Sequence, residues 1–447
     1  MNHITRRTWL HASVWVAAIL VGFAAVFYAN IISFVQHHYF IWFQANSLLV
    51  AALSPLAFVL ATYLVVQFAP EAKGSGIPQV LEAIESGKAT THRAQEDAEL
   101  WDTPSVSIKT AGIKVLSSLV GILGGASIGR EGPTVQIAAS AFTWVGRKLH
   151  KKVPQINFRA FLVAGAGAGV AAAFNTPLAG ITFAIEEIAD GAFGPFRRTV
   201  MLAVIVSGIV AQAILGDYLY FGHIAFGKNT LLVIPQALLI GIVGGIFGGG
   251  FAKILAYPQL ARLPQHWKAR ALVCGILCSI IGYYTHGDTA GSGYEVTKKS
   301  LEAATLTDAS LFFPLLKLST TILSYLSGMA GGIFSPSLSI GAGLGISIAK
   351  IAHFTNFQTC ALMGMVAFFS GVVQAPLTAV IIVMEMTDEH ILILPFMISA
   401  FLAHGVGKGI MPTPLYSFLA GRREDEHHDA LHIPEAEVEK KKLYARN

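Results

Sequence analysis

Long apolar stretches, separated by short polar ones, follow each other along most of the chain. A helix needs about 20 predominantly apolar residues to cross the hydrocarbon core of a bilayer. On that criterion the pattern predicts spanning helices near residues 12–35, 48–68, 200–215, 231–256, 271–284 and 391–410. The chain therefore has the hydrophobic pattern of an all-α polytopic membrane protein.

A second set of apolar segments is shorter, or is interrupted by glycine and proline. These segments predict helices that stop partway through the membrane, a form that builds the sites of transporters. They lie near residues 74–86, 108–122, 130–146, 174–188, 333–350 and 376–387. We therefore expect tilted, partly spanning helices beside the full spans.

Composition and charge agree with a membrane location. Hydrophobic residues make up 54% of the chain and charged residues 13%, whereas soluble proteins carry about 25% charged residues. Basic residues gather in three loops, which the positive-inside rule assigns to the cytoplasm together with both termini. They are Arg147, Lys148, Lys151, Lys152 and Arg159; Arg197 and Arg198; and Arg262, Lys268 and Arg270. The net charge of +5 then needs no nucleic-acid partner.

The remaining polar stretches and the cysteines predict no further domain, cofactor or metal site. Residues 87–105 form a linker rich in Thr, Glu and Asp, and residues 421–447 form a charged tail whose His427 and His428 are best explained as solvated. Three cysteines lie in or beside apolar segments, where helix packing is a better explanation than a disulfide. The first apolar run is long and lacks a small-residue cleavage site, so it predicts a retained helix.

Two halves of the chain repeat the same landmarks. Lys114, Gly129 and Pro133 recur at one constant offset as Lys317, Gly332 and Pro336, and the sequence GSG at 74–76 recurs at 291–293. Downstream, Pro177 and Glu186 recur with identical spacing as Pro376 and Glu385. The chain thus divides into a first repeat, 1–215, a second repeat, 216–420, and the tail 421–447.

Repeats in transporters are commonly inverted about the membrane plane. Corresponding broken helices from the two halves then meet at a site near the midplane. This arrangement predicts that residues 129–133 and 331–336 lie on opposite sides of one site.

Four short motifs stand at predicted helix starts and suit an anion. The first N–H groups of a helix are unpaired and carry the positive end of its dipole, and glycine lets an ion approach the backbone. Ser75 and Tyr416 add hydroxyl donors without a full charge, so an anion would be held loosely enough to leave again. The motifs are GSGIP at 74–78, GREGP at 129–133, GGIFSP at 331–336 and PLYS at 414–417.

Arg130 and Glu131 bring charge into the second motif, and charge at membrane depth usually marks function. A carboxylate would repel the anion that the site suits. A deprotonated Glu131 can instead occupy the anion site itself, and its protonation would let it move away and admit the free anion. A structural ion pair between the two is a weak alternative, because neighbouring helix positions do not face each other.

Four further charged positions each allow two interpretations. Glu186 and Glu187 end a partly apolar segment on the cytoplasmic side; either one relays protons to Glu131, or both simply face water. Lys114 and Lys317 pair with carboxylates or extend to an interface, and a stabilising role is favoured.

The four motifs resemble the anion-site signatures of the CLC family of chloride channels and proton-coupled chloride antiporters, in the expected order from about residue 15 to 420. The resemblance implies a homodimer with one anion pathway per subunit and an inverted-repeat fold. It implies side-chain ligands for a central anion from Ser75 and Tyr416, and backbone N–H ligands from Ile333 and Phe334. Backbone groups from Arg130 to Gly132 would serve an outer site.

The resemblance also assigns Glu131 as the external gate and Glu187 as the internal proton-transfer residue. Because channel members usually have Val at the position of Glu187, the sequence favours a chloride/proton antiporter of a bacterial plasma membrane over a passive chloride channel. Ser75 favours chloride over nitrate. Two departures are the long linker after Ile84 and Leu81, which stands where bacterial relatives often carry a carboxylate at the inner proton entrance.

Two other classes of protein find little support. An intramembrane enzyme would need a recognisable catalytic constellation, and the chain has no HExxH motif. A carrier of larger organic anions would need a clamp of Arg or Lys residues, and Arg130 is the one positive charge inside the four motifs.

Overall fold

The computed structural model describes residues 3–89, 100–150, 156–189, 197–216, 220–222, 233–302 and 311–421. Most of the polar linker, Lys151, Lys152 and the tail histidines fall outside these residues. Within them the structure is helical, with turns and two isolated β-bridges and no strand. The all-α prediction is confirmed.

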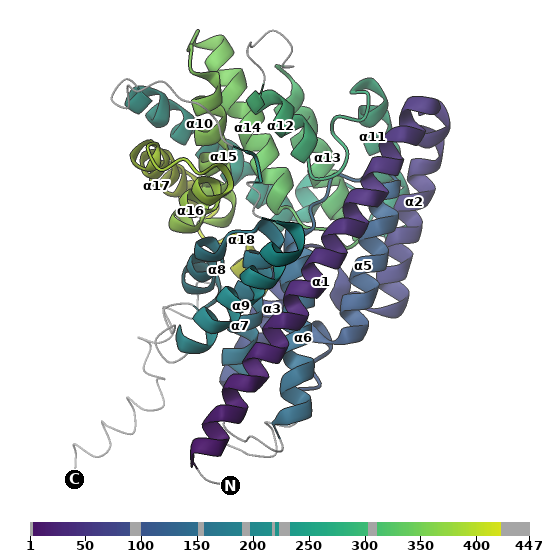
Figure 1. Cartoon of the computed structure of the whole chain (residues 1–447). Coiled ribbons are helices and arrows are strands. Elements are labelled where there is room, and N and C mark those ends of the chain that lie inside the picture. Colours follow the sequence, from purple (N-terminus) through teal and green to yellow (C-terminus); the bar gives the residue numbers. More distant parts are fainter. Residues whose placement is uncertain are drawn as a thin grey trace, which may run out of the picture.

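The first half of the chain contains α1 (His3–Ala45), α2 (Ser47–Phe68), α3 (Ile77–Ala89), α5 (Ile108–Leu123), α6 (Glu131–Leu149), α7 (Phe158–Phe174), α8 (Pro177–Phe183) and α9 (Arg197–Leu215). The second half contains α10 (Ile234–Ala256), α11 (Trp267–Tyr284), α12 (Tyr294–Glu302), α13 (Phe313–Ser327), α14 (Phe334–Ile351), α15 (Phe357–Val373), α16 (Pro376–Thr387), α17 (Ile393–Ile410) and α18 (Leu415–Leu419). The long α1 crosses the molecule obliquely (Figure 1).

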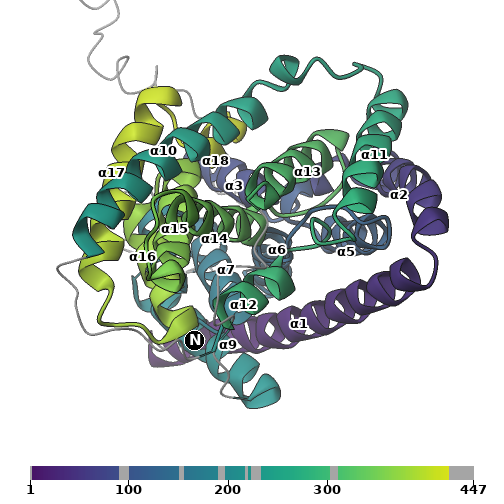
Figure 2. The ribbon, with the colours of Figure 1, turned by 90° about the horizontal axis from the view of Figure 1, so that it is seen from above.

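Seen from above, α10, α16 and α17 group on one side and α2, α5 and α11 on the other, with α6, α13 and α14 between them (Figure 2). Six of the described helices contain stretches long and apolar enough to cross a membrane: Trp9–Ala45, Ser47–Phe68, Arg197–Leu215, Ile234–Ala256, Phe334–Ile351 and Ile393–Leu419. Large apolar side chains such as Phe23, Phe27 and Phe34 of α1 point outward, as expected of a surface that faces lipid.

Several helices differ from the predicted ones in length, and some were not predicted. Helix α14 is long enough to span, although a helix that stops partway was expected. The segment expected near 174–188 begins as α8 and continues as a π-helical turn, Ala184–Ile188. Helices α7, α13 and α15 were not predicted. Both α7 and α15 are almost completely buried, because their small residues pack against other helices and they show no lipid-facing apolar pattern.

Equivalent positions of the two repeats bind each other reciprocally. Gly129 N–H donates to Gly332 O at 2.7 Å, and Gly332 N–H donates to Gly129 O at 2.9 Å. This bridge is antiparallel, so the two equivalent segments run in opposite directions. The pairing is what a two-fold relation between inverted repeats requires, and the predicted meeting of the two motifs is confirmed.

A second reciprocal pair joins the repeats at α8 and α16. The Glu186 carboxylate accepts from the N–H groups of Leu377 and Thr378 at 3.1 and 2.7 Å, at the start of α16. The Glu385 carboxylate accepts from Leu178 and Ala179 at 3.0 and 2.7 Å, at the start of α8. Each repeat therefore supplies the N-terminal cap of a helix in the other.

The two lysines of the repeat also have equivalent partners. Lys114 is fully buried and its Nζ donates to Gly74 O at 2.9 Å, while Lys317 is fully buried and its Nζ donates to Gly291 O at 2.8 Å and Thr289 O at 2.9 Å. Both predicted alternatives, a carboxylate partner and an interfacial position, are wrong. The lysines bind the backbone of the two GSG loops, and the favoured stabilising role fits this geometry.

We expect Glu385→Ala to lower the free energy of unfolding by about 1 kcal/mol, because one exposed and one partly buried N–H group at the start of α8 lose their acceptor. Thermal unfolding in detergent measures the change. Glu302→Ala is the matched control, since Glu302 is exposed and its pair with Lys298 is 4.0 Å long; it should change stability by less than about 0.5 kcal/mol. Equal stability of Glu385→Ala and the native protein would contradict the capping role.

Candidate anion site and gate

The four motifs all lie at helix starts, as the sequence predicts. Helix α3 begins at Ile77, α6 at Glu131, α14 at Phe334 and α18 at Leu415. Helix α3 contacts both α6 and α18, and α6 contacts α14. The structure thus brings the N-terminal ends of helices from both repeats to one region, where their unpaired N–H groups favour a negative charge.

Glycine makes the close approach of these ends possible. Gly74 and Gly76 have φ of +63° and +99°, values that favour glycine. Gly132, in the first turn of α6, packs directly against the hydroxyl and carbonyl oxygens of Ser75, in the space that a Cβ would fill. The GSG loop and the GREGP turn are therefore in contact through Gly132 and Ser75.

Two buried hydroxyl groups lie in this region. Ser75 and Tyr416 are fully buried, and the Tyr416 side chain lies close to Ser75 and within electrostatic range of Glu131 and Glu187. Neither hydroxyl oxygen has a hydrogen-bond geometry with any group in the described residues. Since a buried hydroxyl without a partner is costly, both are available to a bound species.

Ile333 and Phe334 form the start of α14. Ile333 is the N-cap residue and makes no side-chain hydrogen bond to the first turn. The Phe334 ring is held by Phe369 and Phe174, with ring centroids 4.2 and 5.0 Å away. This aromatic contact fixes the first turn of α14, so its backbone N–H groups are presented by a rigid apolar wall.

Glu131 is the first residue of α6 and is 1% exposed. Its side chain folds back over Gly129, where an added Cβ would lie 2.5 Å from Glu131 Oε2 and 3.0 Å from Pro336 Cδ. The carboxylate therefore lies between the starts of α6 and α14. Neither of its oxygens accepts a hydrogen bond from any described residue.

Arg130 lies next to this carboxylate. Its Nε is 3.9 Å from Glu131 Oε1, and one of its terminal nitrogens donates to Ala29 O at 3.2 Å. The expectation that neighbours in a helix do not face each other fails here, because Arg130 is the N-cap and lies outside the helix. The ion pair is long, and the guanidinium also binds the α1 backbone at Ala29.

Glu186 and Glu187 have different environments. Glu186 caps α16, as described above. Its carboxylate therefore does not simply face water, and it is not available as a simple proton relay. Glu187 is 7% exposed and lies in the π-helical turn. The extra residue of such a turn changes the direction of the side chains, a feature often found at functional sites. Leu81 is fully buried in the hydrophobic core. It is the residue expected from the family resemblance to replace the inner carboxylate of bacterial relatives.

A cavity of about 580 Å³ opens beside Arg130. It is formed by α1, the start of α6, the loop between α11 and α12, and α12 itself. The sequence analysis did not identify it, because its polar residues come from four separate segments and share no motif. The recurrence of GSG at 291–293 was the one signal, since Ser292 lines the cavity.

The sequence model of the "Voltage gated chloride channel" family matches residues 56–408. The match covers more than half of the chain. The protein therefore belongs to this family, the CLC family, as the four motifs indicate.

Curated relatives and solved structures agree with the assignment. "H(+)/Cl(-) exchange transporter ClcA" of Yersinia pestis bv. Antiqua (strain Angola) is 32% identical over an alignment of 397 residues, which covers 82% of this chain and 78% of the relative. The protein of the same name from Yersinia pseudotuberculosis serotype O:3 (strain YPIII) has the same values.

Among solved structures, a slow cyanobacterial Cl⁻/H⁺ antiporter aligns with TM-score 0.78 and 24% identity, over 92% of this chain and 97% of that one. A CLC-type fluoride/proton antiporter aligns with TM-score 0.73 and 21% identity, over 94% and 99%. At this level of identity the two structures establish the fold: two inverted repeats of tilted and partly spanning helices.

We expect Gly132→Ala to reduce chloride flux by about tenfold or more, because the new methyl group overlaps Ser75 and separates the GSG loop from α6. Chloride efflux from proteoliposomes measures the effect. Gly112→Ala is the matched control, since an added Cβ at this helical glycine meets nothing within 4 Å. Unchanged efflux in Gly132→Ala would contradict the site.

Proposed function

We propose that the protein exchanges chloride for protons across the membrane as a secondary active transporter. The observation that carries this proposal is the arrangement around Glu131: a buried carboxylate with no hydrogen bond, beside two unpartnered buried hydroxyls and the N-terminal ends of α6 and α14. A site built to hold an anion is thus partly filled by an anionic side chain. The exchanger names of the curated relatives support the same reaction.

The central anion is coordinated by the hydroxyls of Ser75 and Tyr416 and by the backbone N–H groups of Ile333 and Phe334. The backbone around Arg130, Glu131 and Gly132 forms the outer anion site. Partial charges from hydroxyls and helix ends hold a monovalent anion without trapping it, which turnover requires. No enzymatic step and no cofactor is part of this mechanism; chloride and protons are the transported ions.

Glu131 is the external gate. When ionised, its carboxylate competes with chloride for the site between α6 and α14. Protonation removes the charge and the competition, so the side chain leaves and chloride enters. Chloride passage and proton passage are therefore linked through the occupancy of one position.

Glu187 delivers the proton from the inner side. It is buried next to the cap residue Glu186, and its charge lies within electrostatic range of Tyr416. Because Leu81 replaces the inner carboxylate of bacterial relatives, protons reach Glu187 by another route in this chain. A passive voltage- or pH-gated chloride channel with Glu131 as a simple gate is the alternative, and a carboxylate at position 187 disfavours it.

We further propose a multi-pass protein of the bacterial inner membrane, with residues 1–215 and 216–420 as its two repeats and 421–447 as a cytoplasmic tail. The basic residues Arg147, Lys148 and Arg197 support a cytoplasmic location for the C-terminal end of α6 and the start of α9, and we assign both termini to the same side. The cavity beside Arg130 then opens toward the outside. The family resemblance favours a homodimer with one pathway per subunit.

We expect Glu131→Gln to abolish proton coupling while chloride flux continues, because the amide is neutral at every pH and cannot carry a proton. Paired chloride and pH recordings from proteoliposomes under a chloride gradient measure both ions. The unmodified protein should move protons uphill in this assay. Proton transport that survives in Glu131→Gln would rule out its role as the carrier, and loss of all chloride flux would rule out its role as a gate.

We expect Glu187→Gln to reduce proton flux at least tenfold with chloride flux retained, because the amide cannot take a proton from the inner side. The same paired recordings apply. Glu302→Gln, an exposed glutamate on α12, is the control and should transport both ions as the native protein does. Intact coupling in Glu187→Gln would assign proton delivery to another group.

A further inference from the structure

Backbone hydrogen bonds tie the GSG loop of the first repeat to the chain between α13 and α14. Gly74 N–H donates to Met329 O at 2.9 Å, and Gly331 N–H donates to Gly74 O at 3.0 Å. This pairing is a parallel β-bridge between Gly74 and Ala330. The end of α13 therefore lies beside the loop that carries Ser75.

Tyr325, in the last turn of α13, packs on this loop. A Cβ added at Gly74 would lie 3.1 Å from Tyr325 Cε2 and 3.3 Å from the Tyr325 hydroxyl oxygen. Gly74 has φ of +63°, a conformation that favours glycine, and the absence of a Cβ leaves room for the ring against the backbone. The Tyr325 hydroxyl is thus held next to the residue that precedes Ser75.

Three hydroxyl groups from three separate elements gather around this loop. Ser75 belongs to the loop itself, Tyr416 to the start of α18 and Tyr325 to the end of α13. The Tyr416 side chain lies close to Ser75 and within electrostatic range of Tyr325. The site that we propose for the central anion therefore has a third hydroxyl nearby, and this hydroxyl belongs to none of the four motifs.

Tyr325 differs from the other two hydroxyl residues in its exposure. Ser75 and Tyr416 are fully buried, whereas Tyr325 is partly buried and packs against the largest hydrophobic cluster. Among the described residues, no hydrogen bond involves the Tyr325 hydroxyl. A phenol hydroxyl both donates and accepts, and in apolar surroundings it usually finds a partner. Its proton is therefore available to a species in the site.

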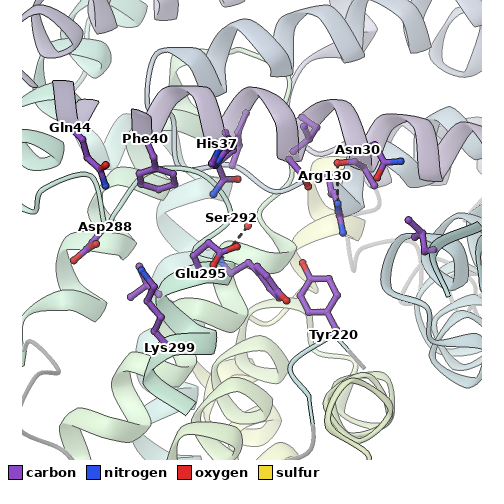
Figure 3. Close-up of a pocket in the computed structure, with 18 of the residues that line it drawn as sticks. Asn30, His37, Phe40, Gln44, Arg130, Tyr220, Asp288, Ser292, Glu295 and Lys299 are labelled. Atoms are coloured by element: carbon purple, nitrogen blue, oxygen red, sulfur yellow. Dashed lines mark hydrogen bonds between the residues drawn. The ribbon is translucent and has the colours of Figure 1, made fainter. Parts of the chain in front are cut away.

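Tyr325 lies outside the cavity beside Arg130 and near a loop that we assign to the cytoplasm. The cavity is lined by Arg130 and Ser292, among others, and Tyr325 is not one of its lining residues (Figure 3). The end of α13 lies instead near Arg270, whose Nη2 is 3.6 Å from the space that a Cβ would fill at Gly328. The positive-inside rule assigns Arg270 to the cytoplasm, which puts Tyr325 at the inner end of the proposed path.

We propose that Tyr325 donates a hydrogen bond to the transported anion on the inner side of Ser75 and Tyr416, and that this third hydroxyl favours small anions over large ones. The inference rests on the proposed chloride path. An anion that enters the site exchanges water for donors of the protein. Hydrogen bonds to a charged group are stronger than those between neutral groups. A small anion, whose charge lies closer to the donor, gains more from each of them.

Tyr325→Phe tests the inference, because it keeps the ring on Gly74 and removes only the hydroxyl oxygen. Calorimetric titration of the purified protein gives dissociation constants for chloride, bromide and thiocyanate. We expect the affinity for chloride to fall about tenfold, as for one lost hydrogen bond to a charged group, and the affinity for thiocyanate to fall less than about twofold. Bromide should lie between them, and the three anion fluxes from proteoliposomes should change in the same order.

Tyr284→Phe is the matched control. Tyr284 is 77% exposed at the end of α11, so the loss of its hydroxyl should leave all three dissociation constants unchanged. Thermal unfolding in detergent without added halide is the second measurement. Tyr325→Phe should unfold at the native temperature, because the packing contacts of the ring remain.

Native chloride affinity in Tyr325→Phe would show that the hydroxyl is not a ligand. A loss of equal size for all three anions, or a lower unfolding temperature, would assign the hydroxyl to packing and would equally refute the inference. These outcomes are separate from the test of exchange. If the native protein moves chloride without protons, the exchange proposal is wrong, while the three dissociation constants still decide whether Tyr325 binds the anion.

Discussion

The two hydrogen bonds exchanged by Gly129 and Gly332 fix the geometry on which the rest of the site depends. They join equivalent residues of two repeats that run in opposite directions, so the helices that follow, α6 and α14, must begin side by side. An unpaired helix end in an apolar interior is unfavourable unless something satisfies it. Two such ends at one place leave N–H groups that the protein's own backbone cannot satisfy and that favour negative charge. The proposed anion site is in this sense a consequence of the way the repeats are joined.

The symmetry of the backbone makes the asymmetry of the side chains informative. Glu131 and Phe334 occupy equivalent positions, each the first residue of its helix. Phe334 is fixed by two aromatic rings, whereas Glu131 has no hydrogen bond to hold it. One side of the proposed site is therefore an aromatic wall, and the other carries a charge that no hydrogen bond fixes. The reciprocal caps formed by Glu186 and Glu385 are symmetric, and both carboxylates accept hydrogen bonds. The same residue type thus caps a helix at one place and is left without a hydrogen bond at another.

How far the sequence predicts this structure depends on what each residue signals locally. The four helix starts could be predicted because glycine and proline leave a clear local pattern, and the repeat offset correctly paired Gly129 with Gly332. Helices α7 and α15 could not, since burial on all sides leaves them without an amphipathic pattern. The caps by Glu186 and Glu385 and the contacts of Lys114 and Lys317 join residues distant in sequence. From sequence alone, a charged residue at such a position is interpreted as a proton relay or as an ion-pair partner. Only the fold shows which backbone groups it binds.

The same limit applies to the cavity beside Arg130, because its lining residues come from segments that are far apart in the sequence. The proposed ion site is built instead from helix starts and hydroxyls, each of which a short motif marks locally. The cavity combines arginine, lysine, two histidines and two carboxylates around open space, and no motif joins them. Arg130 donates to the carbonyl of Ala29 and lies 3.9 Å from Glu131, so it stands where the cavity and the proposed ion site meet.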